Sequence, residues 1–283
     1  MKRFIRMELQ KGLHSSTFYL SIIIGVLITT INVVENISTT SQITENIKQQ
    51  FTGISSSYIG ASLFVNWIAV NIPSLGHQMY YLIWPILAAL PYGWSYYQER
   101  HNGVYYQMVC RSSKTQYLVA KYLAVFISGG LAVSIPVLIN LLISALICPY
   151  CIPKVITSIV AIFDGSFLSE IFYSSPWLHA LIWCVVEFLW GGVAACCCLI
   201  SGTKPRLQVI VTLTPFALFV LLDGVISVIR SFVTINIEFS PLQLASAATL
   251  YQNPEWVVFW VLGLLLLISF VFGYKRVVKD ELI

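Results

Sequence analysis

Residues 96–121 are the most polar stretch that lies between two strongly apolar runs of this chain, and they are also rich in tyrosine. Its charged residues are Glu99, Arg100, Arg111, Lys114 and Lys121, and its later tyrosines are Tyr105, Tyr106 and Tyr117. A plain connector between antiparallel helices needs about 2 to 8 residues, and a disordered linker should be poor in aromatic side chains. The stretch therefore predicts an ordered excursion containing a short helix, either docked on a partner or resting in the lipid headgroups.

Two acidic residues, Glu187 and Asp223, stand inside long apolar runs, where an ionisable side chain is costly. No Lys or Arg lies within these runs to pair with either of them. One interpretation is a polar contact that lines a pathway through the membrane. The other is a protonated or hydrogen-bonded carboxyl that joins two helices. The sequence leaves both interpretations open.

Metal ligands and nucleophiles form no recognisable pattern. Cys148 and Cys151 make a C-x-x-C pair at the end of an apolar run, where either a disulfide or two free thiols would fit. The four histidines are scattered, and the chain has no G-x-x-x-x-G-K-[ST] phosphate loop. The sequence therefore predicts no metal site, no bound cofactor and no ATPase site in this chain.

The composition is that of a membrane protein. Charged residues make up 10% of the chain, against about 25% in an average soluble domain. The mean hydropathy is +0.81. A crossing helix needs roughly 20 apolar residues, and six runs predict the crossings, at about 17–36, 78–97, 120–147, 177–200, 207–229 and 255–274. We expect an all-α integral membrane protein with six transmembrane helices in a single domain, residues 1–283.

The remaining segments are assigned to the two membrane surfaces. Residues 1–16 place Met1, Ile5, Leu9 and Leu13 on one helical stripe, which predicts an interfacial helix. Residues 37–77 and 148–176 are expected to be external loops with short helices, because their apolar runs, Tyr58–Ile72 and Val155–Phe163, are too short to cross.

Basic residues predict the orientation, because Lys and Arg collect on the cytoplasmic side. Of the 16 basic residues, all but Lys48, Lys154 and Arg230 fall in the termini or in the segments after the second and fourth crossings. Six crossings of the cell membrane, with both termini cytoplasmic, satisfy this distribution.

The run QERHNGVYYQMVCRSSKTQYLVAKYLAVF, residues 98–126, resembles the signature of type 2 ATP-binding-cassette (ABC) permeases. In that family an acidic residue ends the second span, a glycine and a serine-containing turn follow, and an aromatic residue with a lysine opens the third span. The matching positions are Glu99, Gly103, Ser112 or Ser113, Tyr117 and Lys121. The six-span layout, the interfacial helix and the short basic tail are similar too, but the first external loop is long for the family.

The resemblance implies a permease subunit of an exporter, driven by a separate cytoplasmic ATPase subunit that binds ATP and Mg. Residues 98–119 would be the coupling segment, which includes the coupling helix and docks on that subunit. The residues expected to act in coupling are Glu99, Arg100, Gly103, Tyr105, Tyr106, Arg111, Ser112, Lys114, Tyr117 and Lys121. A second permease subunit, identical or different, would complete a pathway faced by Asp223 and Glu187. The lipid bilayer is the other expected partner, and nucleic acid is not one.

Other functions also fit the composition. An ion-coupled secondary transporter commonly has internal repeats and several intramembrane charges, of which this chain has only two acidic residues. A membrane enzyme needs convergent His, Asp, Ser or metal ligands near one face, and the scattered histidines argue against it. A non-transporting receptor or immunity protein stays open. The substrate of an exporter also stays open among peptides, drugs and lipids, since family likeness does not identify a site.

Overall fold

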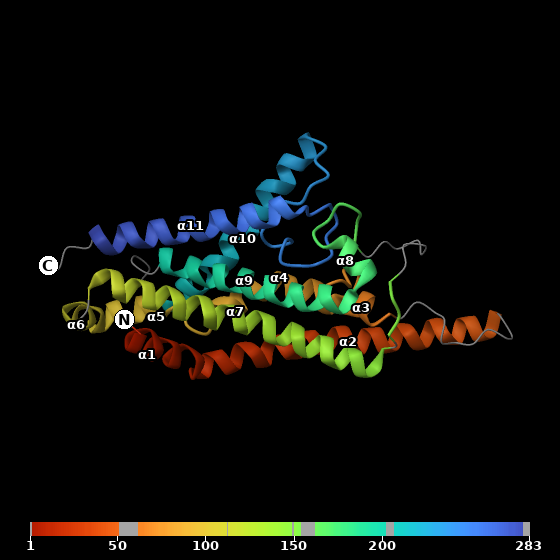
Figure 1. Ribbon diagram of the computed structural model, residues 1–283, viewed down its shortest axis with the longest axis horizontal. Coiled ribbons are helices and arrows are strands. Elements are labelled where there is room, and N and C mark those ends of the chain that lie inside the picture. Colours follow the sequence, from red (N-terminus) through yellow and green to blue (C-terminus); the bar gives the residue numbers. More distant parts are fainter. Residues whose placement is uncertain are drawn as a thin grey trace.

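The computed structural model describes residues 2–50, 62–111, 113–148, 150–153, 162–201 and 207–279. Within these ranges the protein is all-α, as the sequence predicted (Figure 1). The helices are α1 (Lys2–Leu13), α2 (Ser16–Gln50), α3 (Leu63–Asn66), α4 (Leu75–Ala89), α5 (Ser95–His101), α6 (Val104–Arg111), α7 (Lys114–Ile147), α8 (Ser169–Ser174), α9 (Pro176–Ser201), α10 (Gln208–Phe232) and α11 (Glu255–Lys279).

Five of the described helices are long and apolar enough to cross a membrane. The crossing segments are Ser16–Thr39 in α2, Lys114–Ile147 in α7, Pro176–Ile200 in α9, Gln208–Phe232 in α10 and Glu255–Lys275 in α11. Each is at least as long as the roughly 20 residues that a hydrocarbon core requires. The chain is therefore a multi-pass helical membrane protein.

The apolar run expected at 78–97 is divided between two shorter helices, α4 and α5. Residues 90–94 form a turn that contains Pro91 and Gly93. Pro91 has no N–H for the helical ladder, and its carbonyl accepts hydrogen bonds from the hydroxyls of Ser15 (3.1 Å) and Thr17 (3.0 Å). With 15 residues, α4 is too short to belong to the five crossing helices.

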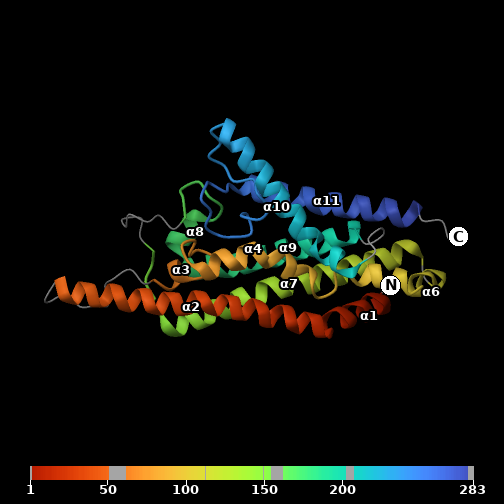
Figure 2. The same ribbon diagram turned by 180° about the vertical axis from the view of Figure 1, so that it is seen from behind.

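The helices run along one long axis, and α1, α6 and the last turns of α11 lie at the same end of it (Figures 1 and 2). We call this end the near end. The opposite end, where α3 and α8 lie, is the far end. The described part of the Tyr58–Ile72 run, residues 62–72, lies at the far end and forms α3 followed by turns, and residues 51–61 are outside the described chain. Most of the Val155–Phe163 run is also outside the described chain.

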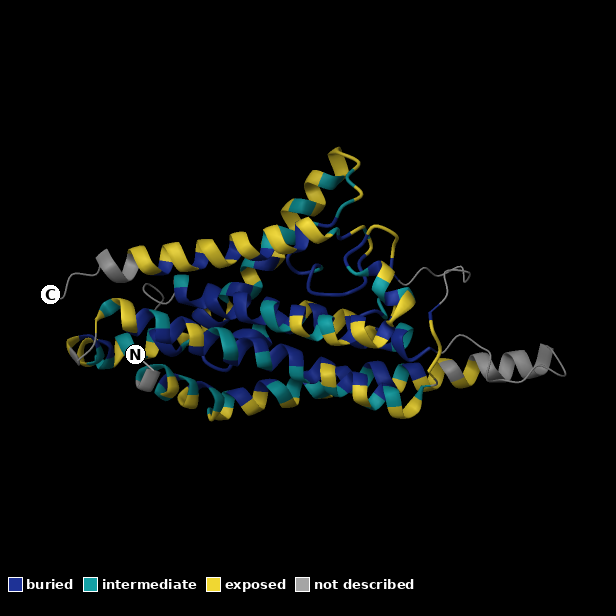
Figure 3. Ribbon diagram, viewed as in Figure 1, coloured by how far each residue is buried: buried dark blue, intermediate teal, exposed yellow. Residues whose placement is uncertain are grey.

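The centre of the bundle is the contact between α7 and α9, with α2 and α4 beside them (Figure 3). Glycine makes this contact close. A methyl group on Gly129 would collide with Ala195 of α9 and lie 2.8 Å from the carbonyl oxygen of Ala88. Small residues at such positions let helix backbones approach one another in a membrane.

Residues 240–249, which lie between α10 and α11 in the chain, are not helical. They fold back from the far end into the bundle, and we call them the inserted segment. Nearly all of it is buried. Two indole N–H groups hold its carbonyls: Trp84 of α4 donates to Leu242 (3.3 Å) and Trp183 of α9 donates to Ala245 (3.2 Å). Irregular backbone is tolerated at membrane depth only where protein or a water-filled cavity surrounds it.

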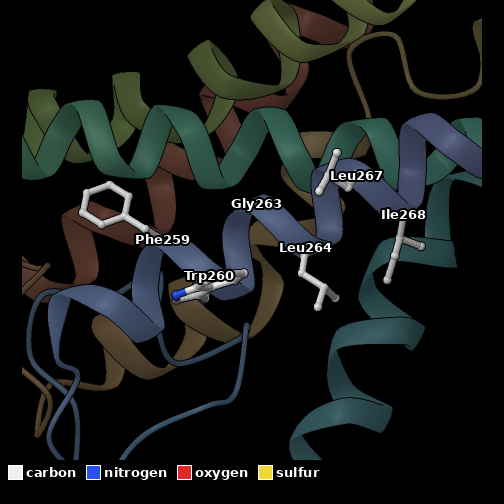
Figure 4. A pocket seen from close by; sticks show the side chains of 6 residues that line it. All are labelled: Phe259, Trp260, Gly263, Leu264, Leu267 and Ile268. Atoms are coloured by element: carbon white, nitrogen blue, oxygen red, sulfur yellow. The ribbon is translucent and has the colours of Figure 1, made fainter.

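Helices α10 and α11 form the least covered face of the molecule, and the far half of α10 stands away from the bundle (Figures 1 and 3). α11 carries an open apolar hollow of about 390 Å³, shown in Figure 4. It is lined by Phe259, Trp260, Gly263, Leu264, Leu267 and Ile268. The hollow lies within the crossing segment of α11.

Candidate functional site

Within the polar stretch at residues 96–121, α5 and α6 form a helical hairpin at the near end (Figure 1). Its turn contains Gly103, whose φ of +73° is a left-handed conformation that glycine adopts without strain. α7 then begins at Lys114, because the hydroxyl of Ser113 accepts a hydrogen bond from the N–H of Gln116 (3.3 Å) and caps the helix.

The base of this hairpin holds a buried lysine between two carboxylates. Lys121 of α7 has 1% of its side chain exposed. Its ammonium nitrogen lies 2.9 Å from Glu8 Oε2 of α1 and 2.7 Å from Glu99 Oε1 of α5. Three helices, of which α1 is distant in sequence from the other two, therefore meet at a single positive charge.

Two tyrosines and a second lysine complete the cluster. The hydroxyl of Tyr117 donates to Glu99 (2.6 Å), and the hydroxyl of Tyr92 donates to Glu8 (2.9 Å). Lys11 reaches the other oxygen of Glu8 at 3.0 Å. We call the set Glu8, Lys11, Tyr92, Glu99, Tyr117 and Lys121 the ionic clamp. It balances two positive charges against two negative ones. Tyr117 bonds Oε2 of Glu99, which the lysines leave open, whereas Tyr92 shares Oε2 of Glu8 with Lys121.

The electrostatics of the clamp can be followed at Glu8, which is fully buried. Burial alone would raise the pKa of this carboxyl, but the ammonium groups of Lys121 and Lys11 outweigh burial and hold the pKa below its ordinary value of 4.5. Glu8 is therefore ionised at neutral pH. A buried ion pair adds little net stability, yet removing one partner costs about 3–5 kcal/mol because the other charge stays buried.

The sequence singled out half of the clamp: Glu99, Tyr117 and Lys121, which the structure brings together. Glu8, Lys11 and Tyr92 were missed. A signal for Glu8 was present, since it is the one acidic residue among the basic and apolar residues of the first 16.

The other residues expected to act in coupling are distributed over the hairpin. Tyr105 is buried against the Tyr117 ring, with centroids 5.4 Å apart, whereas Tyr106 is 40% exposed. Arg100 and Lys114 are half-buried. Ser112 and the side chain of Arg111 lie outside the described part of the chain.

The residues expected along a pathway lie away from the hairpin, in the crossing helices. Glu187 of α9 is fully buried and accepts a hydrogen bond from the hydroxyl of Tyr81 of α4. Asp223 is half-buried on α10, one turn beyond Phe219, which packs on Trp84 with centroids 5.4 Å apart. Within the described chain, no ion pair joins either acid to the clamp.

Cys148 and Cys151 are free thiols at the far end, and the side-chain amide of Asn66 donates to the Cys148 sulfur at 3.8 Å. Among the described residues, no three His, Cys, Asp or Glu side chains are placed to share a metal ion.

Searches against protein-family models, curated proteins and solved structures each find no match to this chain. The class that the fold and composition define is a multi-span helical membrane protein, with five helices able to cross a membrane among the described residues.

Proposed function

We propose that this chain is the permease subunit of an ABC exporter and that the tip of the α5–α6 hairpin docks on a separate cytoplasmic ATPase subunit. The observation that carries the proposal is the ionic clamp, which anchors the base of the hairpin to a crossing helix through Lys121 and to α1 through Glu8. A push on the hairpin would be delivered to both helices, because the anchoring charges are buried and fully partnered.

The two faces of the hairpin support a docking role. One face is buried in the molecule and contains Tyr96, Tyr105 and Val109. The opposite face is exposed and carries His101, Asn102, Tyr106, Gln107 and Cys110. An exposed tyrosine among neutral polar groups, on a base that does not move independently, is the kind of surface that protein interfaces favour. A helix that merely rests in headgroups has no need of a buried ionic anchor.

The rest of the proposal concerns topology. α4, the turn at 90–94 and α5 together would make the second of six crossings, so that both termini and the hairpin tip face the cytoplasm. The distribution of basic residues along the chain supports this orientation. A second permease subunit, identical or different, would pair with this one.

Asp223 is the proposed substrate contact, because it is a half-buried acidic residue inside the α10 crossing segment, whereas Glu35 and Glu255 lie toward the ends of their crossing segments. An intramembrane acid that is not buried in packing is a functional-site hypothesis by default. Peptides, drugs and lipids with a positively charged group would suit it.

The test is purification of the tagged chain in mild detergent from its native host, followed by mass spectrometry and an ATPase assay of what accompanies it. We expect a stoichiometric ATP-binding subunit with ATPase activity. The Tyr106→Ala substitution should lower its recovery several-fold, since aromatic anchors carry much of an interface's energy.

Tyr274→Ala is the matched control, because Tyr274 is a tyrosine of α11 toward the near end with 41% exposure, against 40% for Tyr106. It should leave recovery unchanged. A folded chain that elutes alone under several mild conditions would contradict the proposal.

A further inference from the structure

A buried carboxyl group lies between α4 and α9 and takes no part in the proposed coupling. Glu187 has 0% of its surface exposed. One of its oxygens, Oε1, accepts a hydrogen bond from the hydroxyl of Tyr81. The other, Oε2, is buried and has no hydrogen-bond partner. A charged carboxylate in such a place would be badly under-solvated.

Among the residues that the structure describes, no positive charge faces this carboxyl from the elements packed around it. From α4 it meets Tyr81, whose ring packs on His77 with centroids 4.6 Å apart, and Tyr80, whose hydroxyl donates to the backbone of Val133. Its own helix contributes Cys184, one turn away. His77 is engaged in a hydrogen bond between its Nδ1 and the carbonyl oxygen of Ile68, 2.5 Å apart.

The charges of the other packed helices are engaged elsewhere or lie at the helix ends. Lys121 of α7 is held in the ionic clamp, and Lys114 stands at the near-end start of the same helix. Arg230 of α10 lies 3.2 Å from Glu238 and stacks on a tyrosine ring near the far end. The described part of α11 has no charged residue between Glu255 and Lys275.

We propose that Glu187 is a proton-binding site: the carboxyl carries its proton on Oε2, and Tyr81 donates to Oε1, which closes the contact between α4 and α9. Ionisation without a partner would carry a large desolvation cost in a low-dielectric interior. A neutral acid with one accepted hydrogen bond avoids that cost.

The position of this pair gives it a consequence. Trp84 follows Tyr81 by three residues on α4, and Trp183 precedes Glu187 by four on α9, so both indoles lie about one turn from the pair. These are the two indole groups that hold the inserted segment. Loss of the proton would place a charge between α4 and α9 and loosen the grip of both tryptophans on that segment.

The experiment is infrared spectroscopy of the purified full chain in lipid at neutral pH. A protonated carboxylic acid has a carbonyl stretch well separated from the bands of carboxylates and amides. We expect one such band in the wild-type protein, shifted in heavy water, and its loss in Glu187→Gln. Asp223→Asn is the control, because it removes an acid of α10, the crossing helix that also packs on α9, and should leave the band in place.

Tyr81→Phe keeps the inference testable if Glu187→Gln does not fold. This variant retains the acid but removes the hydrogen bond to Oε1, so the band should move to higher frequency. An identical band in wild type and Glu187→Gln, or a band that Tyr81→Phe does not move, would overturn the inference. No ATPase partner is needed, so the result is independent of the proposed function.

Discussion

Lys121 has 1% of its side chain exposed and still carries a charge, which requires close partners. Glu8 and Glu99 lie within 3 Å of its nitrogen, and the Tyr92 ring centroid lies 4.5 Å away. The compact ammonium group can bond in several directions at once, whereas the planar fork of arginine favours one carboxylate. A lysine therefore suits a junction of three helices, a role that an exposed salt bridge of about 0–1 kcal/mol could not fill.

The lowered pKa of Glu8 predicts a dependence of stability on pH. Since folding favours the ionised form, its contribution is complete above the ordinary value of 4.5 and is lost as the pH falls below it, through the folded pKa. We expect the thermal midpoint of the purified protein to drop between about pH 5 and about pH 3. The drop should be smaller in Glu8→Gln, which has no carboxyl to protonate.

The control for this prediction is Glu170→Gln, which removes an exposed acid of α8 and should keep the wild-type profile. Thermal unfolding followed by intrinsic fluorescence measures all three proteins. Parallel profiles for wild type and Glu8→Gln would show that Glu8 is not ionised in the clamp.

At the level of elements, α7 and α9 depend on glycine at their contact, which predicts a large effect from a small substitution. Gly129→Ala places a methyl group against Ala195 and 2.8 Å from the Ala88 carbonyl, so the helices must separate. Overpacking of this kind costs about 1–3 kcal/mol. The thermal midpoint of Gly129→Ala should fall by several degrees.

Gly224→Ala on α10 is the matched control, because nothing lies within 4 Å of the position a methyl group would take. Alanine favours a helix by about 1 kcal/mol over glycine, so this variant should be unchanged or slightly more stable. Equal losses in the two variants would mean that the α7–α9 contact adapts to the extra methyl group.

Some of these elements could be predicted from the sequence, and there are physical reasons why the others could not. The runs that form α2, α7, α9, α10 and α11 are continuous and apolar, so their length was enough to predict these helices. Hydropathy predicts one helix over 78–97, although this run contains Pro91 and Gly93. It measures only apolar character and does not detect that Pro91 lacks the backbone N–H that a helix needs. The inserted segment is not helical, and two of its carbonyls are bonded by the indoles of Trp84 and Trp183, which are distant in sequence, so no local pattern could predict it.

The candidate site shows the same limit more sharply. Glu99, Tyr117 and Lys121 lie within one stretch and could be grouped by inspection. Glu8 bonds to Lys121 across a separation of 113 residues, and no local pattern in the sequence predicts such a contact. Only the fold, by laying α1 beside α7, makes them partners.

At the scale of the whole molecule, the near end and the far end differ in character. The near end carries the clamp and the exposed hairpin, while the far end carries the inserted segment and the short helices α3 and α8. α7 joins the two ends, and its 34 residues span about 50 Å at 1.5 Å per residue. Residues at its two ends must therefore lie on opposite sides of a bilayer about 40–45 Å thick.

Two native cysteines report on this arrangement. Cys110 is exposed on α6 at the near end, and Cys151 is exposed at the far end. With the near end in the cytoplasm, a membrane-impermeant maleimide added to intact cells should label Cys151 and spare Cys110. Permeabilisation should expose both. The variants Cys110→Ser and Cys151→Ser assign each signal, and the remaining cysteines are buried or half-buried.

The outcome also decides whether α4 and α5 together cross the membrane. The 15 residues of α4 rise only about 22 Å, less than a hydrocarbon core of about 30 Å, so α5 must continue the crossing. If it does, Cys110 is on the same side as α1. A Cys110 signal from intact cells would place the hairpin outside and remove the cytoplasmic ATPase from consideration.

Labelling of Cys151 only after an impermeant reductant would show that it pairs with Cys148 in cells.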